Sequence, residues 1–139
     1  GPVLAALPGV HAMTDVTGFA LAGHALEIAR GAASTLAIDW ARVPLLRGAR
    51  ELALAGNITG ASGRNWAAYG HEVCLPGGFA AVDQALLSDP QTSGGLLVTC
   101  SPDAVEAVLA VFHKMGFDAA ADIGEVTAAA ANGCALLLR

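Results

Sequence analysis

The sequence His11-Ala-Met-Thr-Asp-Val-Thr-Gly-Phe-Ala-Leu-Ala-Gly-His24 decides the fold expected for this chain. Its polar residues and glycine lie where a short strand over 10–13 is expected to lead into a helix over about 16–30. The helix is predicted from apolar side chains at helical spacing, which are Phe19, Leu21, Ala22, Ala25, Leu26, Ile28 and Ala29. Asp15 and Thr17 stand at the junction and are therefore the first candidates for a functional role.

Two hypotheses account for Asp15. As a helix N-cap, its carboxylate would accept a hydrogen bond from a free N–H group of the first turn. The Thr17 hydroxyl could accept such a bond in the same way. As a metal ligand, it would bind a hard cation such as Mg²⁺, which prefers carboxylate, water and phosphate oxygens. The residues alone leave both hypotheses open.

Composition limits the class of protein. The 139 residues suit one domain with a substantial core. Hydrophobic residues make up 55% of the chain and charged residues 14%, so we expect a partner domain or subunit to cover part of the surface. The net charge of −5 and the lack of a basic cluster argue against nucleic-acid binding. We expect no membrane span and no leader peptide, because neither pattern is present.

The three cysteines, Cys74, Cys100 and Cys134, lie far apart in or beside apolar runs. We predict that they are buried, reduced thiols, which indicates a reducing, cytoplasmic location. No Cys-x-x-Cys pair is present and the four histidines lack ligand spacing, which argues against zinc.

The remaining pattern predicts alternating strands and helices. Strands are expected over 35–40, 69–75 and 96–100, the last as a central strand. Helices are expected over 45–55, 79–88 and 102–115. A closing hairpin is predicted from strands 123–127 and 134–138 around Asn132-Gly133. The fold class is therefore α/β (α+β), a single domain with helices packed on a mixed β-sheet.

Two glycine-rich segments are further candidates. Residues 57–68 are expected to form a polar loop, whose N–H groups and Arg64 would cradle a phosphate unless the loop is an ordinary surface connection. The turn over 89–95 has two glycines that allow close approach to an anion or another chain. Alternatively, Asp89 and Thr92 only bind local N–H groups there.

Three motifs in order resemble the C-terminal half of the selenophosphate synthetase (selenide, water dikinase) family. They are Thr14-Asp-Val-Thr-Gly-Phe19 with Leu21 and Gly23-His24, Gly60-Ala-Ser-Gly-Arg-Asn65 with Tyr69-Gly70, and Asp89-Pro-Gln-Thr-Ser-Gly-Gly95. The resemblance implies the C-terminal-domain fold shared with aminoimidazole ribonucleotide synthetase. Position 20 departs from the family, which has glycine there. Alanine would be strained at positive φ but favourable in a helix, and we expect the helical conformation.

The resemblance also implies a reaction in which ATP, selenide and water give selenophosphate, AMP and phosphate. Asp15 matches the family's Mg²⁺ carboxylate, and the residues implied to bind Mg-ATP are Thr17, Gly18, Arg64, Asn65, Thr92 and Ser93. The other metal ligands, a catalytic cysteine or selenocysteine and a lysine belong to the family's N-terminal half, and none of the three cysteines matches that position. We therefore expect no catalytic residue in this chain. We expect an N-terminal ATP-binding domain as its partner, a homodimer at full length, and no activity for this chain alone.

Two alternatives remain open. In the first alternative, the chain would belong to another enzyme of the superfamily, such as aminoimidazole ribonucleotide synthetase, thiamine-phosphate kinase or a hydrogenase maturation protein. Gly18-Phe19, Gly23-His24 and the 89–95 motif together speak against that. In the second alternative, the chain would be a non-enzymatic binding module in which Asp15 only caps a helix. An Asp15→Asn variant would then leave the activity of the full-length protein unchanged.

Overall fold

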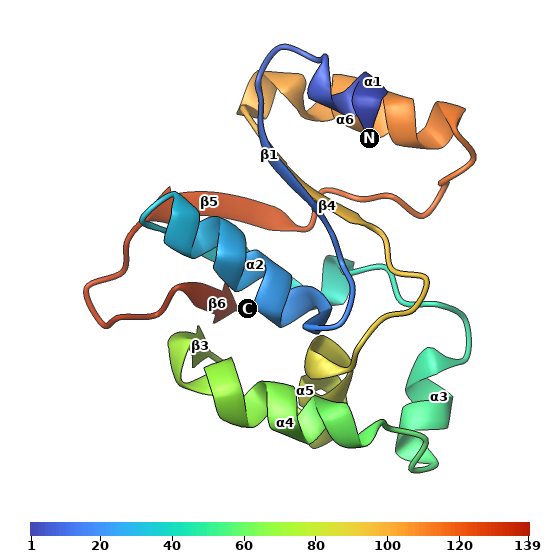
Figure 1. The fold of residues 1–139 in the computed structure, drawn as a ribbon, viewed down its shortest axis with the longest axis vertical. Helices are drawn as coiled ribbons and strands as arrows, with labels where there is room; N and C mark the ends of the chain where they lie inside the picture. The colour runs from blue at the N-terminus through green and yellow to red at the C-terminus, as the bar shows by residue number, and fades with distance from the viewer.

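The computed structural model describes residues 1–139 and contains two β-sheets surrounded by helices (Figure 1). Strands β1 (Val10–Asp15) and β4 (Leu96–Cys100) form an antiparallel two-stranded sheet. The second sheet has the order β3-β6-β2-β5, with strands β2 (Ser34–Ile38), β3 (Val73–Cys74), β5 (Gly124–Ala128) and β6 (Leu136–Leu138). Because β2 is antiparallel to β5 and parallel to β6, this sheet is mixed, and the predicted fold class is confirmed.

Six α-helices surround these sheets. They are α1 (Pro2–Ala5), α2 (Ala20–Gly31), α3 (Ala49–Leu54), α4 (Gly60–Tyr69), α5 (Ala81–Ser88) and α6 (Val105–Lys114), with 3-10 turns η1 (Trp40–Arg42), η2 (Gly70–Glu72) and η3 (Pro102–Ala104). The two-stranded sheet runs from the end of the molecule that carries α1 and α6 toward the end that carries α4 and α5 (Figure 1). The helices predicted over 79–88 and 102–115 are confirmed. None of the helices has the length and apolar character to cross a bilayer.

Helix α2 forms the centre of the core. Ala22, Ala25, Leu26 and Ala29 on its inner face are completely shielded from solvent. They belong to a cluster that includes leucines of β2, β6 and α5, namely Leu36, Leu136, Leu138 and Leu87. Since burial of each leucine contributes about 1.5–3 kcal/mol, this cluster fixes α2 on the four-stranded sheet.

Both strands of the predicted closing hairpin are present as β5 and β6, but the predicted pairing between them is wrong, because β2 lies between them. The middle of β2 is the apolar run Leu36-Ala37-Ile38, in which every residue is at most 3% exposed. A strand buried in this way takes an inner place in the sheet and separates its two neighbours. Strand β4 was expected to be central, but it pairs only with β1.

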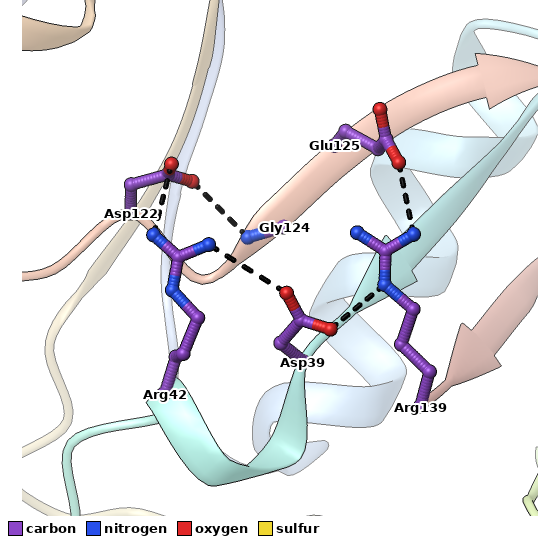
Figure 2. Close-up of polar contacts among 6 residues, drawn as sticks. All are labelled: Asp39, Arg42, Asp122, Gly124, Glu125 and Arg139. Carbon is purple, nitrogen blue, oxygen red and sulfur yellow. Dashed lines mark hydrogen bonds and ion pairs between the residues drawn. The ribbon is translucent and has the colours of Figure 1, made fainter.

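A cluster of charged side chains joins the ends of these strands (Figure 2). Arg139 donates to Asp39 at 2.7 Å and to Glu125 at 2.9 Å, and Arg42 donates to Asp122 at 3.0 Å. The Arg139 guanidinium holds the pKa of the Asp39 carboxyl below its usual range. Backbone bonds from Asp39 to Ile123 and from Arg139 to Ile38 complete the same junction. Together these contacts join the chain segments at one end of β2, β5 and β6.

The predicted loop over 57–68 is also wrong, since most of it is helix α4. Ser62 is 3% exposed, and its hydroxyl bonds Ser88 of α5 at 2.9 Å and the Ala85 carbonyl at 3.0 Å. The small polar residues that resemble a loop therefore form a helix–helix contact. Two neighbouring predictions were too long: the helix over 45–55 is limited to α3, and the strand over 69–75 is reduced to β3 after η2.

Two of the three cysteines are not reduced thiols. Cys74 at the end of β3 and Cys134 before β6 form a disulfide, with Cα atoms 5.8 Å apart. Only Cys100 is free, and burial raises the pKa of its thiol. The sequence did not reveal the pair because β3 and β6 become neighbours only in the folded sheet. The inference of a reducing location therefore loses its support from these two residues.

Candidate functional site at the end of strand β1

Strand β1 places Asp15 at the edge of the two-stranded sheet. Asp15 is the last residue of the strand and pairs with Leu96 of β4. Its side chain is exposed and makes no hydrogen bond or ion pair. The N-cap hypothesis is wrong for Asp15 and for Thr17: α2 begins at Ala20, and no side chain caps its N-cap residue, Phe19. The Asp15 carboxylate is thus available for a ligand.

The segment that follows Asp15 is held against the 89–95 turn. Val16 donates its N–H to the Gly95 carbonyl at 2.9 Å, and Gln91 donates its N–H to the Thr17 carbonyl at 3.0 Å. A Cβ atom at Gly94 would overlap the Val16 carbonyl, so glycine is required for this close approach. Two motifs that are 75 residues apart in the sequence thus form one surface.

Helix α4 brings the third motif to the same place. The Asn65 side-chain amide donates to the carbonyls of Gly18 and Ser88, each at 3.0 Å. An amide nitrogen has two protons, so both are used within the protein. At the start of α4, the hydroxyl of Thr59 donates to the Asp89 carboxylate at 2.6 Å and its N–H donates at 3.1 Å. All three motifs identified in the sequence therefore meet at the N-terminal end of α2.

The turn into α2 contains a second correction. Ala20 has φ of +59°, so the expected helical conformation is wrong and the residue lies in the left-handed region. Its N–H closes a tight turn by donating to the Thr17 carbonyl at 3.0 Å. The buried Tyr69 hydroxyl donates to the Phe19 carbonyl at 2.8 Å and holds the turn from the other side. These contacts offset the roughly 1–2 kcal/mol that left-handed alanine costs.

The profile of the family described as "AIR synthase related protein, C-terminal domain" matches residues 1–135. The chain belongs to this family. It is 61% identical over 132 residues to selenide, water dikinase of Burkholderia pseudomallei (strain K96243), covering 95% of the chain and 37% of that protein. Two further relatives have the same name. The protein from Pseudomonas straminea is 56% identical, and the match covers 94% of the chain and 36% of that protein. The protein from Rhizobium meliloti (strain 1021) is 48% identical, and the match covers 95% of the chain and 38% of that protein.

These similarities confirm the resemblance inferred from the three motifs. The chain spans little more than a third of the length of the relatives it matches. The residues predicted to bind Mg-ATP differ in whether their side chains already have hydrogen-bond partners within the chain. Arg64, Thr92 and Ser93 are exposed and their side chains have no hydrogen-bond partner, whereas the Asn65 amide is fully engaged. The first three remain available for a ligand.

The donor chemistry suits a hard cation but supplies only part of a site. Asp15 offers an unpaired carboxylate at an exposed strand end, which is the type of oxygen ligand that Mg²⁺ prefers. No group of three or more His, Cys, Asp or Glu side chains in the chain could hold a metal ion. A cation at Asp15 would therefore need phosphate oxygens or carboxylates from elsewhere.

Two side chains at this site, those of His24 and Glu27, were not among the predicted site residues. His24 bonds the Thr17 hydroxyl at 3.1 Å, and Glu27 bonds the other ring nitrogen of His24 at 3.1 Å. The available signal was helical spacing, because Glu27 follows His24 by three residues and so shares a helix face with it. Gly23 packs against the same turn into α2: a Cβ there would lie 2.5 Å from Phe19 Cβ and 3.1 Å from the Tyr69 ring.

Proposed function

We propose that this chain is the C-terminal domain of a selenophosphate synthetase and that it contributes Asp15 to a Mg-ATP site completed by an N-terminal domain. The observation that carries the proposal is the unpaired Asp15 carboxylate at the point where three motifs meet. The names of the relatives support the reaction, in which ATP, selenide and water give selenophosphate, AMP and phosphate.

Phosphoryl transfer requires positioning and neutralisation of phosphate charge more than covalent chemistry by the protein. Mg²⁺ would supply that neutralisation when bound with ATP. Asp15 would bind the cation, and the unpaired Arg64 guanidinium would offset phosphate charge. The N–H groups of Gly18, Thr92 and Ser93 have no acceptor within the chain and are available to phosphate oxygens. We assign Asn65 a positioning role, because its amide ties Gly18 to α5.

The missing ligands would come from the N-terminal ATP-binding domain of the same protein. Because 132 matched residues are only 37% of the Burkholderia pseudomallei relative, that relative is about two and a half times as long as this chain, which leaves room for such a domain. Large apolar side chains are exposed here: Phe19 at 55%, Leu46 at 75% and Leu54 at 67%. Phe19 lies within the candidate site, so covering it would place the second domain beside Asp15. A chain without these ligands is expected to be inactive alone.

The test is an Asp15→Asn substitution in the full-length protein, assayed by selenide-dependent formation of AMP from ATP. Asparagine keeps the size of the side chain but removes the charge that binds Mg²⁺. We expect turnover to fall at least 100-fold, because metal catalysis depends on this charge. Asp118→Asn is the matched control, since Asp118 is also exposed and unpaired. Normal turnover by Asp15→Asn would refute the metal assignment. Activity with a rival superfamily substrate but not with selenide would refute the reaction.

A further inference from the structure

Thr17, His24 and Glu27 form a chain of hydrogen bonds beside Asp15. His24 on α2 is 7% exposed, and its Nε2 atom lies 3.1 Å from Thr17 Oγ1. Its Nδ1 atom lies 3.1 Å from Glu27 Oε2, one helical turn further along. The Phe19 ring lies beside the imidazole, with ring centroids 6.0 Å apart and the ring planes tilted by 52°. The imidazole is thus held at both nitrogens and packed beside an aromatic ring.

The chemistry of these groups sets the direction of each hydrogen bond. An ionised carboxylate only accepts, so the proton in the bond to Glu27 belongs to His24 Nδ1. In a neutral imidazole the other nitrogen, Nε2, is then an acceptor. With His24 neutral, the Thr17 hydroxyl therefore donates its single proton to Nε2. Its oxygen retains lone pairs but has no proton left for a phosphate oxygen.

Asp15 and Thr17 are separated by one residue. They flank Val16, which is 8% exposed and points into the core, and alternate residues of an extended segment point to opposite sides. We therefore expect both side chains on the side of the chain opposite Val16, and Thr17 is partly exposed.

We propose that Thr17 accepts a hydrogen bond from a water molecule bound to the divalent cation at Asp15, and that His24 and Glu27 are positioning residues that keep Thr17 an acceptor. This inference rests on the proposed function and makes it more specific. It assigns Thr17 to the hydration shell of the cation, while Gly18, Arg64, Thr92 and Ser93 remain with the phosphates. Glu27 acts without contacting the substrate, by selecting the tautomer of His24.

The tautomer is tested on the 139-residue chain by ¹⁵N NMR of its histidine rings, with His24→Gln used to assign the His24 signals. We expect His24 to carry its proton on Nδ1, although isolated histidine favours Nε2. Glu27→Gln should abolish this preference, because an amide can donate as well as accept. Glu106→Gln, an exposed glutamate on α6, is the control and should change nothing. A proton on Nε2 in the unsubstituted chain would overturn the inference.

The role of Thr17 is tested in the full-length enzyme by varying Mg²⁺ at saturating ATP. Thr17→Val keeps the shape but removes the acceptor, and we expect the Mg²⁺ concentration for half-maximal activity to rise roughly tenfold. Thr17→Ser should restore it. An increase in the KM for ATP alone would instead make Thr17 a phosphate donor and overturn the inference. If Asp15→Asn abolishes activity while Thr17→Val changes nothing, this inference fails and the proposed function stands. If Asp15→Asn is fully active, the proposed function itself fails.

Discussion

Replacement of Gly94 by alanine should separate two of the three motifs at the candidate site. The added Cβ would overlap the Val16 carbonyl, which is backbone and cannot rotate away as a side chain would. The segments must move apart, and the adjacent bond from Val16 to the Gly95 carbonyl, now 2.9 Å, is lost or lengthened. Overpacking typically destabilises by about 1–3 kcal/mol, and a lost hydrogen bond adds about 1 kcal/mol. We therefore expect Gly94→Ala to lose about 2–4 kcal/mol of unfolding free energy.

The neighbouring residue provides a matched control. A Cβ at Gly95 meets no atom within 4 Å, so Gly95→Ala should be neutral or stabilise by up to about 1 kcal/mol through the unfolded state. Urea denaturation followed by circular dichroism measures both variants. With an m-value of about 2 kcal/mol per molar, Gly94→Ala should lower the midpoint by about 1–2 M. Equal midpoints for the two variants would refute the reasoning, because the close contact would then exert no constraint.

Two further predictions concern buried groups. Burial raises the pKa of Tyr69, the only tyrosine, to about 12, so its phenolate absorbance should appear near pH 12 rather than near 10. Because the folded pKa is the higher one, this stabilisation is complete below pH 10 and disappears between pH 10 and 12; an ordinary titration curve would contradict the burial of Tyr69. The disulfide predicts one reactive thiol in the denatured, unreduced protein and three after reduction. Its reduction should lower the unfolding free energy by up to about 4 kcal/mol for a loop of 60 residues, and three thiols before reduction would contradict the pairing.

The sequence by itself determined the elements whose signals are local. Apolar runs predicted β1, β2, β4, β5 and β6, and helical patterns predicted α2, α5 and α6. The three motifs also predicted the correct family, because each motif is a continuous stretch of sequence and the three occur in the expected order. Asp15 could be selected as a ligand candidate because a carboxylate next to a predicted strand end can be recognised in the sequence.

Tertiary structure decided the features that depend on neighbours distant in the chain. The Ser62–Ser88 contact packs α4 against α5 where a loop was predicted, and the place of β2 between β5 and β6 excludes the predicted hairpin. Likewise, Cys74 meets Cys134 only once β3 and β6 are adjacent. The site itself follows the same rule. Backbone bonds and the absence of a Cβ at Gly94 allow the 89–95 turn to pack onto Val16, and folding leaves Asp15 without a partner. Local patterns specify elements, whereas pairing, burial and the availability of a side chain are properties of the packed molecule.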